Sequence, residues 1–221
     1  MPLPAPAERQ LLHTRRVTCQ GFFRRDGLFD IEGHITDEKS YDQQDEYRGD
    51  LRAGDFVHNM WIRLTVDPRM TIVDVEAATD NSPYRICGQI TPNFKKLIGL
   101  RIAAGFHREV KARLGGVHGC THLVELLGPV ATTAFQAIDS ERAAELREAW
   151  EAEHADEAAT RVAAARSKGP PTVLNTCHAW AADGEVVARW APDYYTGGDV
   201  KLARKARRRG AEASRNPDAE A

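Results

Sequence analysis

The densest group of chemically capable side chains lies in the segment HGCTHLVEL, which carries His118, Cys120, His122 and Glu125 within eight positions. Imidazole, thiolate and carboxylate groups are the usual protein ligands of zinc and iron. We expect a helix to begin near Cys120, and its free amides and positive end would favour the thiolate that metal binding and nucleophilic attack both require. The same segment also fits a plain helix start, with Thr121 or Cys120 as the cap and the histidines at the rim.

Two further segments supply ligands that would complete a metal site. His58 stands in VHNM at the start of an expected strand, and Cys87 follows the same expected hairpin in YRIC. A tetrahedral site needs four nitrogen, sulfur or oxygen ligands, so the sequence predicts a zinc or iron site made by His58, Cys87, Cys120 and His122. If one of the four binds weakly, a coordination position opens for water or substrate. Taken alone, His58 is better explained as a surface imidazole and Cys87 as a buried thiol, and it is the combination of the four residues that favours a metal site.

Acidic and basic residues crowd a third segment, DGLFDIEGHITDEK. Alternation along a strand places Asp30 and Glu32 on one face, and a solvated strand face explains most of these charges. Near a metal, Asp37 or Lys39 could instead handle protons, because a neighbouring cation shifts either pKa toward neutrality. Glu125 is the third candidate for acid–base work.

Composition restricts the class of protein. The chain has 221 residues, of which 42% are hydrophobic and 28% charged, with a formal charge of -2. These values are typical of one folded domain and give no general attraction to nucleic acid. We find no apolar run of the roughly 18 residues that a membrane helix needs and no signal-peptide core, so we expect a cytoplasmic protein with free thiols. A nucleotide-binding motif is also absent, so no nucleotide cofactor is expected.

The pattern of apolar residues predicts hairpins followed by helices. RRVTCQGFF and LFDIEGHITD alternate around the turn at Asp26-Gly27, and VHNMWIRLTV and TIVDVEAAT alternate around DPRM. GFHREVKARLGG and THLVELLGPVATTAFQAI then show helical spacing, with a kink expected at Gly128-Pro129. The predicted fold class is therefore α+β, with an antiparallel sheet built from hairpins and helices packed on one face.

The chain divides into five segments by composition. We expect a flexible N-terminus, an α+β core domain, a charged helix with its linker, a C-terminal hairpin and a basic disordered tail, at residues 1–14, 15–138, 139–171, 172–195 and 196–221 respectively. The charged helix, with acidic and basic residues three or four apart over 139–168, could contact a protein partner. The expected C-terminal hairpin carries Cys177 and His178, which are further candidate ligands.

Four motifs, DGLFDIEGHITDEK, HNMWIRLTVD, GCTHLVELL and NTCHAW, resemble those of a bacterial domain family that is known only as having unknown function. The resemblance extends from about Arg15 to Trp190. It implies the extent of the domain and carries no activity with it.

Residues 55–137 are also similar to the U-type scaffold of iron–sulfur cluster assembly, through VHNMWIRLTVD, TIVDVEA, Cys87 and HGCTHL. The similarity implies that His58 takes the place of the family's site Asp, Cys87 that of its middle Cys and Cys120 that of its last Cys. Phe56 stands where the first Cys belongs, and the loop before Cys87 differs in length. These departures argue against cluster building by the same mechanism and leave a metal pocket as the shared feature.

Two functions follow as alternatives. The first is a zinc- or iron-dependent hydrolase or lyase that acts on a small polar or aromatic metabolite. The second is a scaffold or carrier that holds zinc or an iron–sulfur cluster without catalysis of its own. A metal-free domain whose cysteines belong to the core is the third interpretation.

Overall fold

The computed structural model describes residues 3–155, 171 and 173–197, and the chain forms two compact units, Met1–Ala165 and Arg166–Ala221. The first unit contains the sheet and the helices that cover it. Among the described residues, no helix is both long enough and apolar enough to cross a membrane.

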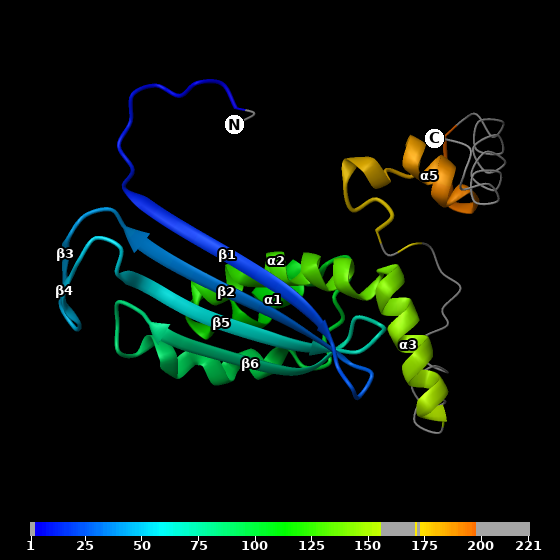
Figure 1. Cartoon of the computed structure of the whole chain (residues 1–221), viewed down its shortest axis with the longest axis horizontal. Coiled ribbons are helices and arrows are strands. Elements are labelled where there is room, and N and C mark those ends of the chain that lie inside the picture. The colour runs from blue at the N-terminus through cyan, green and yellow to red at the C-terminus, as the bar shows by residue number, and fades with distance from the viewer. Residues whose placement is uncertain (1–2, 156–170, 172, 198–221) are drawn as a thin grey trace. The chain divides into compact units, whose positions relative to one another are not determined.

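A four-stranded antiparallel sheet forms the centre of the first unit (Figure 1), in the order β1 (His13–Phe23), β2 (Phe29–Lys39), β5 (Phe56–Val66) and β6 (Ile72–Asn81). The segment of chain that connects β2 to β5 forms a separate small hairpin of β3 (Gln43–Asp45) and β4 (Gly49–Leu51). Gly27, with φ 74°, forms the positive-φ position of the β1–β2 turn that the sequence predicts. The predicted α+β class is confirmed.

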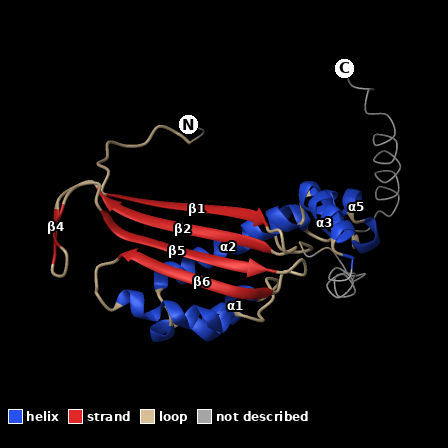
Figure 2. Ribbon diagram, turned by 60° about the horizontal axis from the view of Figure 1, so that its bottom comes forward, coloured by secondary structure: helices blue, strands red, loops and turns tan. Residues whose placement is uncertain are grey.

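The helices cover one face of this sheet, as Figures 1 and 2 show. They are a 3₁₀-helical run η1 (Cys87–Leu97), then α1 (Phe106–Leu114), the short turn η2 (Gly116–His118) and the long helix α2 (Thr121–Ile138). Alternate residues of β2, including Ile31 and Ile35, are buried under them and share one core with Leu123 and Leu127 of α2. The burial of one strand face explains the alternating sequence pattern.

Helix α2 lies directly on β1 and β2 because two glycines make room for it. A Cβ atom at Gly33 would stand 2.5 Å from Val130 Cγ2, and one at Gly21 would stand 2.5 Å from Ala137 Cβ. Gly21 pairs with Ile31 of β2, so Ala137 lies near position 31 of β2 and Val130 near position 33. Helix α2 therefore runs antiparallel to β2. The N-terminus of α2 therefore lies at the C-terminal end of β2, the end that carries Asp37. The helix is continuous through Pro129, where the sequence predicts a kink.

Helix α3 (Glu141–Glu153) follows α2 and occupies the first part of the predicted charged helix. Ser140 caps it by accepting a hydrogen bond from the Ala143 amide. Trp150 Nε1 donates to the Arg25 carbonyl at 2.8 Å, which holds α3 against the β1–β2 turn. The remainder of the predicted helix and its linker, residues 156–170, lies outside the described residues.

Two boundaries expected from the sequence are corrected. Strand β1 begins at His13, inside the stretch expected to be flexible. In the second unit, the predicted hairpin over 172–195 is wrong, because the described residues there form three short helices, η3 (His178–Trp180), α5 (Glu185–Trp190) and η4 (Pro192–Tyr194). The Asp183-Gly184 pair leads into a helix rather than a hairpin turn, and Val187 and Ala188 are buried on one side of that helix. Of the predicted basic tail, residues 198–221 lie outside the described residues.

Candidate metal centre

A row of three side chains crosses the sheet near the end of β2. The strand register pairs Arg15 of β1 with Asp37 of β2, and Asp37 with His58 of β5. Directly opposed residues on antiparallel strands have Cβ atoms about 5 Å apart, so the sheet itself brings these groups together. The β2–β5 register shifts immediately after Asp37, and such bulges are frequent next to active sites.

Asp37 is the buried centre of this row, with a side chain only 1% exposed. Its Oδ1 accepts hydrogen bonds from Arg15 Nε and His13 Nε2, both at 2.8 Å, and its Oδ2 accepts one from Arg15 Nη2 at 2.9 Å. Burial alone would raise the pKa of Asp37, but the hydrogen bonds and charge of Arg15, helped by His13 and His58, lower that pKa to about 2. Asp37 is therefore a carboxylate at neutral pH.

Glu125 holds the third nitrogen of the Arg15 guanidinium. Its Oε2 accepts from Arg15 Nη1 at 2.8 Å, and its side chain is 55% exposed. Glu125 is the third residue that the sequence offers for acid–base work. In the structure it is bound to Arg15, one helical turn beyond His122, where it balances the charge of the cation that orients Asp37.

The imidazoles of His58 and His122 face the Asp37 carboxylate from β5 and from the first turn of α2. His58 Nδ1 lies 3.0 Å from Asp37 Oδ2, yet this buried nitrogen has no partner in hydrogen-bonding geometry. His122 Nε2 lies 3.9 Å from the same oxygen, and the two ring centroids are 3.8 Å apart. One ligand atom from each of the three residues lies within 4.8 Å of the other two.

Both histidines are held in the neutral form. Burial is the main cause that lowers the pKa of His58, the neighbouring His122 lowers it further, and Asp37 opposes the shift. Burial followed by the charge of Arg15 lowers the pKa of His122. Neutral imidazole and ionised carboxylate are the forms that a metal ion binds, so protons do not have to be displaced at neutral pH.

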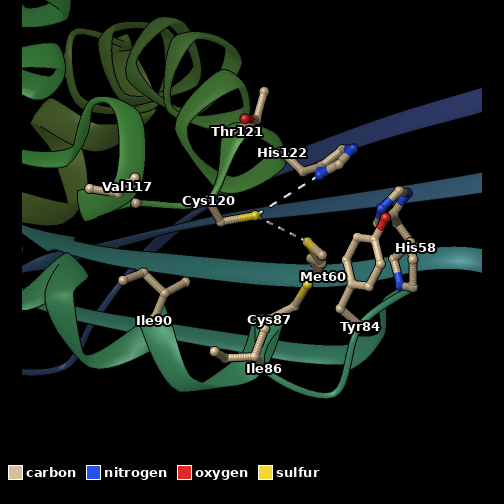
Figure 3. A pocket seen from close by; sticks show the side chains of 12 residues that line it. His58, Met60, Tyr84, Ile86, Cys87, Ile90, Val117, Cys120, Thr121 and His122 are labelled. Atoms are coloured by element: carbon tan, nitrogen blue, oxygen red, sulfur yellow. Dashed lines mark hydrogen bonds between the residues drawn. The ribbon is translucent and has the colours of Figure 1, made fainter. Parts of the chain in front are cut away.

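A cavity of about 370 Å³ opens beside these ligands, and Figure 3 shows the side chains that line it. All four metal ligands predicted from the sequence, His58, Cys87, Cys120 and His122, line this one cavity. Cys120 precedes α2, and its Sγ lies 3.9 Å from His122 Nδ1 and 3.9 Å from Met60 Sδ. Among the described residues, however, the group whose ligand atoms lie close enough to share an ion contains Asp37 in place of the two cysteines.

Lys39 does not belong to this site. Its ammonium lies over the ring of Tyr41, 5.9 Å from the centroid, and it does not line the cavity. His13 and Arg15 are hydrogen-bonded neighbours of Asp37 that the sequence motifs do not indicate. The hairpin register could have found Arg15, because Arg15 and Asp37 are each eleven positions from Asp26 at the turn.

The remaining acidic residues of β2 have structural partners on the opposite face. Asp30 Oδ1 accepts from Thr65 Oγ1 at 2.7 Å, and Glu32 forms an ion pair with Arg63 at 2.6 Å. Cross-strand pairing of this kind stabilises the sheet and accounts for these charges without chemistry.

A family model described as "Protein of unknown function (DUF2889)" matches residues 13–136, more than half of the chain. The chain belongs to the DUF2889 family. The predicted membership in a family of unknown function is thereby confirmed. The DUF2889 region contains all four strands of the central sheet together with Asp37, His58 and His122, whereas NTCHAW lies beyond it. No curated protein and no solved structure matches the chain.

The ligand group of this DUF2889 domain has the composition of a catalytic metal site. Two imidazoles and one carboxylate bind zinc in hydrolases and iron in non-haem enzymes, and three protein ligands leave further coordination positions open. The His58 nitrogen fits this interpretation, because Nδ1 is buried 3.0 Å from Asp37 Oδ2 and has no partner in hydrogen-bonding geometry. The carboxylate, in turn, is fixed by Arg15 and His13, as the outer neighbours of metal ligands usually are.

Proposed function

We propose that this protein is a zinc- or iron-dependent hydrolase or lyase that acts on a small molecule in the cavity beside Asp37, His58 and His122. The observation that carries the proposal is the convergence of one ligand atom each from Asp37, His58 and His122 within 4.8 Å of one another. A bound ion would act as a Lewis acid toward a substrate oxygen or water.

The surrounding residues have distinct tasks in this proposal. Arg15 and His13 hold the Asp37 carboxylate in one orientation through Oδ1 and Oδ2. Cys120 positions His122: when Nε2 faces Asp37, the other ring nitrogen faces the Cys120 sulfur at 3.9 Å. A second partner of this kind fixes the tautomer and the ring orientation of a metal-bound histidine. Cys87 lines the cavity, where it would contact substrate.

The test is the metal content of the purified protein, measured by mass spectrometry of the elements beside variants of the ligands. We expect about one zinc or iron per wild-type chain, and loss of the metal in His58→Ala and His122→Ala. His34→Ala is the matched control, because His34 is a half-buried imidazole that stacks on Trp61 and bonds to Asn59 instead. Unchanged metal content in both ligand variants would overturn the proposal.

The alternative is a scaffold or carrier for zinc or an iron–sulfur cluster, and the two thiols and two imidazoles that line a single cavity favour it. In that case α3, whose exposed side bears the Arg142–Glu145 ion pair, would contact the protein acceptor. The carrier should be brown after anaerobic purification with iron and should pass its cluster to an acceptor. A colourless protein with about one zinc per chain would count against it.

Within this proposal the protein works in the cytoplasm. All four cysteines are free thiols, which suits a reducing compartment. Fractionation of the cells that produce the chain would check the assignment, and recovery of the protein outside the cytoplasmic fraction would refute it.

A further inference from the structure

We infer that the substrate of this site is a small molecule with an uncharged, apolar body about the size of one aromatic ring and a single oxygen-bearing group at one end. The inference rests on the proposed metal function, since the oxygen-bearing group would be directed to the ion at His58 and His122. It narrows the substrate class from polar or aromatic metabolites to ring-sized apolar ones.

The two ends of the cavity differ in chemistry. Figure 3 shows His58 and His122 at one side and Ile86, Ile90 and Val117 at the other, with Met60 between them. A bound molecule that fills this space must therefore place its apolar part against the isoleucines and valine. Its polar group is left facing the imidazoles, where the Asp37 carboxylate lies 3.0 Å from His58 Nδ1.

The described part of the cavity wall carries no charged side chain to pair with a second charge on the substrate. Among the described residues that line it, none is Lys, Arg, Asp or Glu. Arg15 is the cation bound to Asp37, and its donors are already used, because Nε and Nη2 bond to Asp37 and Nη1 bonds to Glu125. A charged group at the far end of the substrate would meet no side chain of opposite charge there, and it would gain less from covering Ile86, Ile90 and Val117 than an apolar group does.

The volume of the cavity and the exposure of its apolar lining also favour an apolar substrate of about one ring. An apolar cavity of about 150 Å³ is large enough to hold benzene, so the 370 Å³ here fits one ring with substituents. Three of the lining side chains are unusually exposed for apolar residues: Tyr84, Ile86 and Val117 are 59%, 67% and 88% exposed. An apolar body in the cavity would cover part of that surface and gain free energy from its removal from water.

The first experiment compares metal-binding probes on cobalt-loaded protein, followed by the visible spectrum of the ion. Benzohydroxamate and acetohydroxamate both bind the ion through the hydroxamate group. The first carries a phenyl ring where the second carries a methyl group. We expect benzohydroxamate to bind at least about tenfold more tightly, because its ring buries more apolar surface. A carboxylate at the far ring position, in 4-carboxybenzohydroxamate, should remove that gain. Equal affinities for all three probes would overturn the inference.

A second measurement separates this inference from the metal proposal. Phenol is added to the metal-free protein, and amide shifts are followed by NMR. Shifts confined to residues 86–90 and 117–122 would support an apolar binding site even if cobalt fails to bind, and the metal proposal alone would then fall. If cobalt binds but phenol shifts none of these amides, the metal proposal stands and the inference on the substrate is overturned.

A matched pair of variants locates the effect. Ile86→Asp places a charge on the cavity wall at an exposed position, and Ile98→Asp places the same charge on an exposed residue that does not line the cavity. Ile86→Asp should weaken benzohydroxamate at least fivefold without changing acetohydroxamate or cobalt binding. Ile98→Asp should change none of them, and equal weakening by both variants would contradict the proposed contact.

Discussion

Asp37 and His58 stand directly opposite each other on neighbouring strands, with His58 Nδ1 3.0 Å from Asp37 Oδ2, although 20 residues separate them in the sequence. Sheet register creates this pair, and the packing of α2 on β1 and β2 adds His122 to it. Because each of the three groups comes from a different rigid element, their geometry does not depend on a loop.

Metal binding should stabilise the folded chain, because a ligand that binds only the folded state adds stability by mass action. At a zinc concentration about 100-fold above Kd the gain is about 2.7 kcal/mol, which corresponds to a rise in Tm of roughly 5–10 °C. Thermal unfolding with zinc and with EDTA measures it. His34→Ala should keep the rise and Asp37→Asn should lose it. A Tm independent of zinc in the wild type would contradict the metal site.

Arg15→Gln should destabilise the metal-free protein by about 1–3 kcal/mol, because it leaves the Asp37 carboxylate buried without its main partner. The effect stays below that of a fully buried pair since the Arg15 side chain is 36% exposed. Urea unfolding measures the change. Arg142→Gln breaks an ion pair on the exposed side of α3 and should change stability by less than about 0.5 kcal/mol. Similar effects of the two substitutions would refute the stabilising role of the Arg15–Asp37 pair.

The stability of the metal-free protein should fall in two steps as pH decreases. The pKa values of His58 and His122 are lowered in the folded state from 6.5, so the unfolded chain takes up protons first as pH falls through about 6.5, and stability is lost there. The pKa of Asp37 is lowered from 3.8 to about 2, so its contribution is full above about 3.8 and disappears as pH falls toward 2.

Urea unfolding at a series of pH values measures these two steps. The double variant His58→Ala/His122→Ala should lack the upper step and keep the lower one, whereas His34→Ala should show both. If the loss of stability near pH 6.5 persists in the double variant, it comes from groups other than His58 and His122, and this prediction is wrong.

Gly33→Ala should displace α2 and with it His122. The new Cβ would meet Val130 Cγ2 at 2.5 Å and Leu126 Cγ at 3.0 Å, and such overpacking costs about 1–3 kcal/mol. Zinc affinity should fall as well, because one ligand stands on the displaced helix. Gly88→Ala is the control, since nothing lies within 4 Å of a Cβ atom there. A Gly33→Ala protein with wild-type stability and zinc affinity would show that α2 does not need this close approach.

Local sequence patterns were sufficient for the sheet and for α2, because Asp26-Gly27 sets the first hairpin and the apolar spacing from Leu123 to Ile138 sets the helix. The motifs also predicted that His58, Cys87, Cys120 and His122 share one site, and the four residues line one cavity. The motifs did not show that Asp37 belongs to the ligand group, since that depends on which residue of β5 lies opposite it. The β-branched Val186-Val187 pair suggested a strand in the second unit, where one-sided burial of Val187 and Ala188 instead suits a helix.

Cys120 distinguishes the ligand set expected from the sequence from the one that the structure favours. If Cys120 only orients His122 through the 3.9 Å contact between Sγ and Nδ1, Cys120→Ala should keep the metal with an affinity lowered by about 10–100-fold. If Cys120 is a direct ligand, its loss should be as damaging as His122→Ala, and the cobalt protein should show a sulfur-to-metal charge-transfer band that Cys120→Ala removes. Competition with a coloured chelator gives the affinities. Cys177→Ala is the matched control, because that thiol is exposed in the second unit and should leave both affinity and spectrum unchanged.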